Sequence, residues 1–339
     1  MAIPEIVSSH EIGKLQIKHL KRYWNKSILI RDRKLNATDL PAEWKTDTTL
    51  LTVVGVGLEP TIQYLYQYAP SFEQFEDWIT KTSGKPDADK VNQFNKLFDA
   101  ENSAANANQT SYEILTPEDI DFWGQNGYVI IRNAITKESC DQTIEAICNF
   151  IEIDRYDQST WYNAHSAKQG IMIQLFHHPA IEQNRKAYKI KKAYEELWQR
   201  TDIWANADRV GFNPPETQAY PFQGPRLHWD VSIKPPIPFG TQGILYLADT
   251  AENQGAFTVV PGFQNKVEEW LNSLPAGVDP RRENLYALGP KPIAANAGDF
   301  IIWHQALPHG SSPNTSLLPR FVQYINYAPA DEKEAEEWI

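Results

Sequence analysis

The 339-residue sequence predicts a mainly β protein with helices, in which an antiparallel double-sheet jelly roll follows an N-terminal helical extension. The second half of the chain has short runs of β-branched and aromatic residues broken by Gly and Pro, which is typical of short strands and tight turns. The first third shows helical start signals instead. Hydrophobic residues form 42% of the chain, which allows a sizeable core in one large domain or two modest ones.

Residues 1–110 are expected to form the extension and residues 111–339 the jelly-roll domain. The extension shows no repeat and no catalytic motif. We expect it to pack on the jelly roll; a dimerisation surface and a wall of a substrate pocket are the alternatives.

Three helices are predicted in the extension, at residues 11–24, 71–79 and 91–98. The second has the clearest start, because Ser71 stands at the N-cap position and Gln74 at the capping-box position. The segment 99–109 is rich in Asn and Ala and is typical of an exposed linker.

Charge and hydropathy exclude several classes of partner. The net charge is −11 and the pI is about 5.3, which disfavours nucleic acid and anionic membranes. The N-terminus lacks the basic start and apolar run of a secretory signal. The apolar segment 50–58 is too short to span a bilayer.

The two cysteines, Cys140 and Cys148, fall in one predicted helix at residues 137–151. Eight residues of helix separate their Cα atoms by roughly 12 Å, beyond the roughly 7 Å reach of a disulfide. We therefore expect small buried thiols and a reducing, cytoplasmic location.

The chemistry of the chain is indicated by His228, Asp230, His309 and Arg320. On a strand, residues two apart point to the same side, so His228 and Asp230 can chelate one ion. His309 follows the strand-like run 298–304 and supplies a second imidazole. Two imidazoles and one carboxylate form the ligand set of non-heme Fe(II) oxygenases. The planar guanidinium of Arg320 can grip the carboxylate of a keto acid.

His304 competes with His309 for the role of third ligand. We favour His309, because Gly310 and Ser311 follow it and because Arg320 stands eleven residues later. His304 is then an extra histidine that does not bind the metal.

The remaining histidines offer no further site. His177 and His178 are adjacent and point to different sides, so surface or helix-cap roles are expected. His10, His19 and His165 have no partner in the sequence and receive no role.

From about residue 115 to residue 329, the chain resembles the phytanoyl-CoA dioxygenase family of Fe(II)/2-oxoglutarate-dependent oxygenases. The resemblance is carried by the HxD motif at 228–230 and by segments 115–123, 126–131, 255–262 and 298–311. An HxD motif alone is weakly specific, but these segments occur in the order typical of the family. The resemblance implies a double-stranded β-helix, the cupin-like form of the jelly roll.

The resemblance also implies roles for particular residues. His228, Asp230 and His309 would hold Fe(II). In halogenating relatives a small residue replaces the carboxylate, so Asp230 favours hydroxylation.

Three further residues would bind 2-oxoglutarate, the cosubstrate. Arg320 would bind its distal carboxylate, and the hydroxyl of Ser311 would assist that arginine. Tyr246 falls near a strand position that lines the keto-acid pocket in this family.

The substrate is poorly specified by the sequence. The proline-rich loop 231–239 follows the HxD motif and is expected to form a rim, where Lys234 could meet an anionic substrate, although a solvated lysine is the more common case. Four aromatic residues are candidates for the pocket, although aromatic residues are also common in cores: Trp161, Tyr162, Phe222 and Trp303.

The expected activity is hydroxylation of a small organic substrate by dioxygen, with oxidative decarboxylation of 2-oxoglutarate to succinate and CO2. The alternatives are halogenation, epimerisation or desaturation at the same site, or a non-catalytic jelly-roll binding protein. No nucleic-acid or membrane partner is expected; a homodimer is possible.

Overall fold

The computed structural model describes residues 6–36, 43–99, 111–330, 332, 335 and 337–339. The chain divides into two compact units. The helical unit comprises Met1–Asn108, Asp202–Ala207 and Pro329–Asp331, and the sheet unit comprises Gln109–Thr201, Asp208–Ala328 and Glu332–Ile339. The predicted linker segment 99–109 lies almost wholly outside the described residues.

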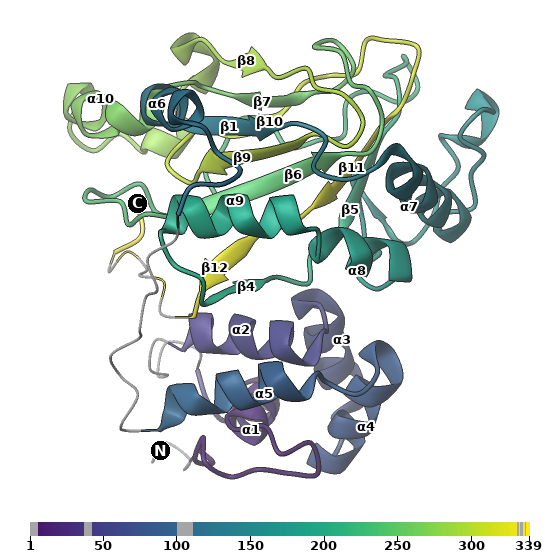
Figure 1. Ribbon diagram of the computed structural model, residues 1–339, viewed down its shortest axis with the longest axis vertical. Helices are drawn as coiled ribbons and strands as arrows, with labels where there is room; N and C mark the ends of the chain where they lie inside the picture. The colour runs from purple at the N-terminus through teal and green to yellow at the C-terminus, as the bar shows by residue number, and fades with distance from the viewer. Residues whose placement is uncertain (1–5, 37–42, 100–110, 331, 333–334, 336) are drawn as a thin grey trace. The chain divides into compact units, whose positions relative to one another are not determined.

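Within the described residues, the helical unit has five α-helices, seen in the lower part of Figure 1, and their buried side chains form one apolar core. They are α1 (Leu20–Arg31), α2 (Trp44–Val54), α3 (Leu58–Tyr68), α4 (Phe72–Ser83) and α5 (Ala88–Asn95), which the 3₁₀ turn η2 (Lys96–Phe98) extends; the short strand β4 (Ile203–Ala205) belongs to the same unit. Helix α4 begins as predicted: the Ser71 hydroxyl accepts from Gln74 N, and Gln74 Oε1 accepts from Ser71 N.

The first predicted helix, at residues 11–24, is wrong, because α1 begins only at Leu20. Gln16 and His19 adopt positive φ angles of 57° and 68°, which an α-helix cannot contain. The backbone N–H groups of Lys14 and Leu15 donate to the Glu76 carboxylate rather than to helical carbonyls. A tertiary contact therefore replaces the local helix.

The sheet unit is an antiparallel jelly roll, which confirms the predicted fold class. A seven-stranded sheet has the order β1-β9-β6-β11-β5-β3-β2, and a three-stranded sheet has the order β10-β7-β8. The strands are β1 (Tyr128–Ile131), β2 (Lys168–Gln169), β3 (Met172–Ile173), β5 (Val210–Asn213), β6 (Thr241–Tyr246), β7 (Phe257–Val259), β8 (Lys291–Pro292), β9 (Phe300–His304), β10 (His309–Ser311) and β11 (Arg320–Tyr324), with β12 (Tyr327–Pro329) following β11.

The core of this unit lies between the two sheets, because its buried side chains come from strands of both. They include Ile244, Phe257, Val259, Ile301, Trp303 and Val322. Five α-helices surround the sheets (Figure 1). These helices are α6 (Pro117–Asn126), α7 (Lys137–Phe150), α8 (Pro179–Arg185), α9 (Tyr188–Trp198) and α10 (Val267–Ser273). Four 3₁₀ turns complete the unit: η3 (Gln158–Thr160), η4 (Phe263–Asn265), η5 (Pro280–Arg282) and η6 (Leu285–Leu288).

Helix α7 bears out the prediction for the cysteines. Cys140 and Cys148 are both buried and form no disulfide. Burial raises the pKa of the Cys140 thiol to about 12 and that of Cys148 to about 11, so neither is a reactive thiolate. None of the helices in the described part of the chain is both long and apolar enough to cross a membrane.

Candidate metal centre

Two histidines far apart in the sequence meet through their backbones. His228 and His309 form a single antiparallel bridge, in which His228 N donates to His309 O at 2.9 Å and His309 N donates to His228 O at 3.0 Å. The continuous strand predicted around His228 is absent. Pro225, just before the bridge, has no N–H for a ladder, and the chain leaves the bridge for a loop after His228.

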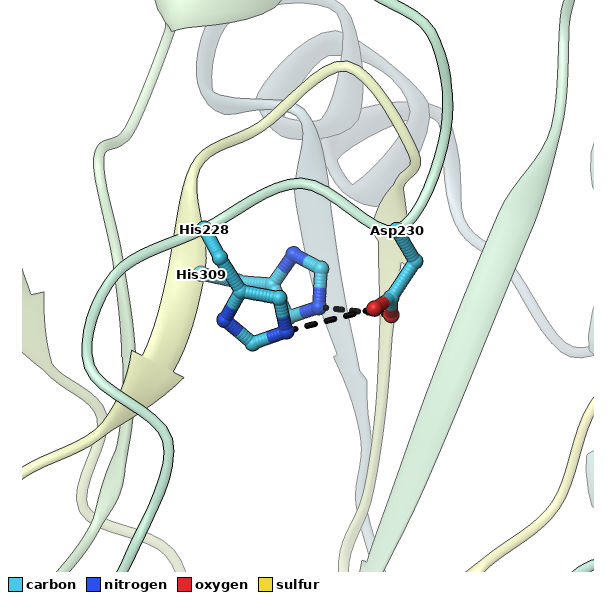
Figure 2. Close-up of side chains that lie close together, drawn as sticks. All are labelled: His228, Asp230 and His309. Atoms are coloured by element: carbon cyan, nitrogen blue, oxygen red, sulfur yellow. Dashed lines mark hydrogen bonds and ion pairs between the residues drawn. The ribbon is translucent and has the colours of Figure 1, made fainter. Parts of the chain in front are cut away.

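The side chains of His228, Asp230 and His309 converge although Asp230 lies in the loop (Figure 2). Asp230 Oδ1 lies 3.2 Å from His228 Nε2, and Asp230 Oδ2 lies 3.2 Å from His309 Nε2. The side chain of His309 is 7% exposed, whereas those of His228 and Asp230 are 37% and 48% exposed. The group is therefore anchored on one side and accessible from the other.

Backbone carbonyls orient both imidazoles. His228 Nδ1 lies 2.7 Å from the carbonyl oxygen of Arg226, and His309 Nδ1 lies 3.1 Å from that of Leu307. A carbonyl oxygen only accepts, so each Nδ1 carries the proton. Each Nε2 points toward Asp230. Without a metal, a proton on Nε2 is donated to the carboxylate, and that proton must leave before the nitrogen can offer its lone pair to a metal.

At Asp230 and His228, neighbouring groups shift the pKa in the direction opposite to the effect of burial. Burial alone would raise the pKa of Asp230, but hydrogen bonds from His228, His309 and Gln242 outweigh it and hold that pKa well below its ordinary value. Burial tends to lower the pKa of His228, yet the hydrogen bond and charge of Asp230 give a net increase. The carboxylate is ionised at neutral pH and can act as an anionic ligand.

Gln242, which the sequence analysis missed, restrains the Asp230 side chain together with Trp303, which was predicted only as a pocket aromatic. Gln242 Nε2 donates to Asp230 Oδ2 at 2.6 Å, and Trp303 Nε1 donates to Gln242 Oε1 at 3.1 Å. Gln242 in β6 and Trp303 in β9 are direct cross-strand partners. The sequence did offer one sign of Gln242, a polar residue in a mostly apolar strand. It does not show the strand register that places Gln242 opposite Trp303.

A second missed residue, Arg281, restrains the backbone of the same loop. Its guanidinium donates to Trp229 O at 2.9 Å and to Val231 O at 2.5 Å, on either side of Asp230. It also donates to Ile339 O at 3.0 Å and lies 4.6 Å from the ring centroid of Trp338. Arg281 thus ties the ligand loop to residues at the end of the chain.

Arg320 is fully buried and has unused donors. Its Nη1 donates to Ser311 Oγ at 3.1 Å, whereas Nε and Nη2 have no hydrogen-bond partner among the described residues. Asn213 lies directly opposite Arg320 in the β5–β11 pair, and its Nδ2 is also unpartnered within the described part of the chain. Buried donors without acceptors are costly, so this pair indicates a place for an acceptor with several oxygens.

The sequence-based candidate Tyr246 has its hydroxyl group engaged by the backbone. The phenol donates to Ile293 O at 2.8 Å and accepts from Phe257 N at 2.8 Å. The side chain is fully buried, and burial raises its pKa. These contacts give Tyr246 a structural role between the sheets.

A pocket of about 280 Å³ adjoins the three converging side chains. Besides them it is lined by Met172, Asp208, Arg209, Pro225, Gln242, Ile244, Phe257, Trp303, Gly310, Ser311, Tyr324 and Asn326. Of the four aromatic candidates only Trp303 is part of this lining. Trp161 and Tyr162 hydrogen-bond to the backbone elsewhere, at Asp154 O and Pro215 O. Lys234 forms an ion pair with Glu337.

The other histidine considered as a ligand, His304, lies outside the converging group. Its Nδ1 accepts from Ala306 N at 3.0 Å, and its ring packs near Trp123 and Phe239. Burial lowers the pKa of His304 to about 4. His178 has the helix-cap role expected for the adjacent pair, since it accepts from Ala180 N at the start of α8.

Comparison with known proteins places this chain among the oxygenases. The family model for phytanoyl-CoA dioxygenase (PhyH) matches residues 123–322. A Dictyostelium discoideum protein that carries the phytanoyl-CoA dioxygenase name is 26% identical over 260 residues, which cover 62% of this chain and 74% of that protein.

Two solved structures resemble this chain in part, at low sequence identity. AviO1 from Streptomyces viridochromogenes Tue57 is 15% identical, with a TM-score of 0.47 over 66% of this chain and 100% of that one. HygX from Streptomyces hygroscopicus, with nickel and 2-oxoglutarate bound, is 13% identical, with a TM-score of 0.44 over 65% of this chain and 89% of that one. The family match covers more than half of the sequence, and the chain belongs to the phytanoyl-CoA dioxygenase family of non-heme iron, 2-oxoglutarate-dependent enzymes.

Proposed function

We propose that this protein hydroxylates a small organic substrate at an Fe(II) held by His228, Asp230 and His309, with 2-oxoglutarate bound by Arg320. In the overall reaction a substrate C–H bond becomes C–OH, and 2-oxoglutarate becomes succinate and CO2. One oxygen atom of O2 enters the hydroxyl group and the other enters succinate. The bound metal supplies the redox chemistry that couples these two oxidations.

The donor set supports a metal of this kind. Two neutral imidazole nitrogens and one ionised carboxylate, with ligand-type atoms within 4.8 Å of one another, match the facial triad of non-heme Fe(II) oxygenases. The backbone hydrogen bonds at both Nδ1 atoms hold each Nε2 in position before a metal arrives. Asp230 forms no direct ion pair with a Lys or Arg among the described residues; the nearby Arg281 is bonded to backbone carbonyls and leaves the carboxylate oxygens free for a metal.

The observation that carries the proposal is the buried guanidinium of Arg320. Its Nε and Nη2 lack acceptors within the described residues, and Ser311, which it contacts, lines the same pocket as the triad. A carboxylate can accept two parallel hydrogen bonds from such a fork. We assign this place to the distal carboxylate of 2-oxoglutarate, with the Ser311 hydroxyl and the Asn213 amide beside it.

The size of the pocket supports a small substrate. About 280 Å³ must hold both the cosubstrate and the reacting part of the substrate. Phe257, Trp303 and Met172 provide apolar walls, and Arg209 and Asn326 provide polar groups. The apolar walls exclude water from the reacting atoms, and the polar groups can orient a polar substrate. Asp230 occupies the ligand position that halogenating relatives leave open, which supports hydroxylation.

A metabolite screen that follows succinate release tests the proposal. The purified protein with Fe(II), 2-oxoglutarate and O2 should release succinate faster in the presence of its substrate, and mass spectrometry should find a product heavier by one oxygen atom. His228→Ala is the matched inactive control. A wild-type protein that binds Fe(II) but gives no spectral response to 2-oxoglutarate would contradict the proposal and favour a binding protein.

A further inference from the structure

We infer that Gln242 is a positioning residue that holds one oxygen of Asp230 so that the carboxylate offers its other oxygen to the metal. This inference rests on the proposed function. It depends on a chain of two hydrogen bonds, from the Trp303 indole to the Gln242 amide and from that amide to Asp230.

The orientation of the Gln242 amide follows from its two partners. The indole N–H of Trp303 can only donate, and the ionised carboxylate of Asp230 can only accept. The amide oxygen must therefore face Trp303 and the amide nitrogen must face Asp230, which removes the usual ambiguity between the two ends of an amide. The distances of 3.1 Å and 2.6 Å agree with that assignment.

Trp303 is itself held rigidly. It is 3% exposed, and its ring lies 4.3 Å from that of Phe257 between centroids and 5.1 Å from that of His309. The β6–β9 register places Gln242 directly across from it. The amide is thus oriented by the packed core rather than by solvent.

Asp230 needs such a restraint more than the histidines do. It lies in a loop, its side chain is 48% exposed, and no backbone ladder holds it. Arg281 fixes the peptide groups before and after it through Trp229 O and Val231 O, but these contacts leave the side-chain torsions free. Gln242 Nε2 and His309 Nε2 both contact Oδ2, at 2.6 Å and 3.2 Å. When His309 Nε2 turns its lone pair to a metal, Gln242 is the hydrogen-bond donor that remains on Oδ2.

The way in which Asp230 binds a metal determines how many coordination positions remain open. A carboxylate that binds through both oxygens takes two positions, whereas one that binds through a single oxygen leaves a position for another ligand. The facial triad requires open positions for a chelating keto acid and O2. Occupation of Oδ2 by Gln242 favours binding through Oδ1, and hydrogen-bonded ligand carboxylates are also better positioned for the metal.

Metal titration of the full-length protein tests this role. Apo wild type, Gln242→Leu and Gln242→Asn are titrated with Co(II), and the visible spectrum is recorded at saturation. Leucine removes both hydrogen bonds at similar volume. Asparagine keeps an amide but is one methylene too short to reach both partners, so it serves if the leucine variant does not fold. Each variant should bind Co(II) about 10- to 100-fold more weakly, with a changed ligand-field spectrum at saturation.

Thr241→Val is the matched control, because Thr241 is the adjacent residue of β6 and accepts the indole N–H of a different tryptophan, Trp198, at 2.9 Å. It should keep the wild-type affinity and spectrum, since a general weakening of β6 does not alter the ligand field. Wild-type affinity and spectrum in Gln242→Leu would overturn the inference alone. A wild-type protein that binds neither Co(II) nor Fe(II) would overturn the proposed function, and the inference with it.

Discussion

Each of the two units contains a cluster of histidine and carboxylate side chains. The two clusters differ in the groups that pair with their carboxylates. In the helical unit, the ligand-type atoms of His19, Glu43 and Asp47 lie within 4.8 Å of one another. Lys26 Nζ lies 2.9 Å from Glu43 and 2.6 Å from Asp47, and Arg22 also pairs with Glu43. Both carboxylates of this cluster are thus paired with a buried lysine.

The cluster in the sheet unit has two histidines and one carboxylate and no lysine ion pair among the described residues. Asp230 interacts with the two histidines and with the neutral amide of Gln242. The cluster also faces a pocket, whereas the side chains of His19 and Lys26 are 2% and 5% exposed. We therefore expect a metal only at the cluster whose carboxylate has no lysine or arginine ion pair among the described residues and which a pocket makes accessible.

The largest expected effect is the loss of metal from one cluster only. Asp230→Ala and His309→Ala should abolish stoichiometric Fe(II) binding, because each removes one of three protein ligands. His304→Ala and Asp47→Ala should retain one Fe(II) per chain. Anaerobic titration with metal analysis measures this, and full occupancy in Asp230→Ala or loss of iron in Asp47→Ala would reverse the assignment of the two clusters.

Substitution of Arg320 should weaken cosubstrate binding without affecting metal binding. Arg320→Ala should keep Fe(II) but weaken 2-oxoglutarate by on the order of 2–5 kcal/mol, because a buried charge pair is lost. Arg320→Lys should restore part of the affinity, since it has the charge without the planar fork. Anaerobic titration of the Fe(II) protein, followed by the visible charge-transfer band of the bound keto acid, gives both affinities. Unchanged affinity in Arg320→Ala would show that another group anchors the cosubstrate.

Lys26 tests the structural role of the cluster in the helical unit. Lys26→Met should lower the free energy of unfolding by on the order of 3 kcal/mol, because Glu43 and Asp47 lose their shared buried cation. The exposed pair of Lys34 and Asp32 is the control, and Lys34→Met should cost under about 1 kcal/mol. Urea denaturation measures both. Equal stability in the two variants would mean that the buried cation does not hold this cluster together.

The smallest expected effect comes from His304, a half-buried histidine without a carboxylate partner among the described residues. Burial lowers its pKa from 6.5 to about 4, so the folded state prefers the neutral ring. Its contribution to stability is complete above pH 6.5 and is lost as the pH falls toward 4. Wild type should lose on the order of 2 kcal/mol more than His304→Phe over that interval. Parallel unfolding curves against pH would show that His304 titrates normally.

The sequence predicted several local features because they depend on neighbouring residues. The capping box at Ser71 and Gln74 formed as expected, since both partners lie within one helical turn. The helix that carries Cys140 and Cys148 also formed, because a helical pattern needs no distant contact. The predicted helix at 11–24 failed where the distant Glu76 competed for backbone N–H groups.

The residues of the proposed metal site also fall into those predicted from the sequence and those found only in the structure. His228, Asp230, His309 and Arg320 were identified from motifs, and the structure brings the first three together while their role in metal binding stays a prediction. The supposed strand around His228 was wrong, because one bridge to His309 and a loop replace it. The support for Asp230 from Gln242 and Arg281 was not predicted at all.

The sequence by itself determined which side chains can donate to a metal and to a carboxylate, because that depends only on residue type and on spacing within short motifs. Tertiary structure alone decided that Gln242 and Arg281 support Asp230, which donors of Arg320 are left without acceptors among the described residues, and that Lys26 pairs with the carboxylates of the other cluster. Strand register and loop path set these outcomes. They depend on contacts between residues tens to hundreds of positions apart, which are decided by the packing of the whole core rather than by local preference.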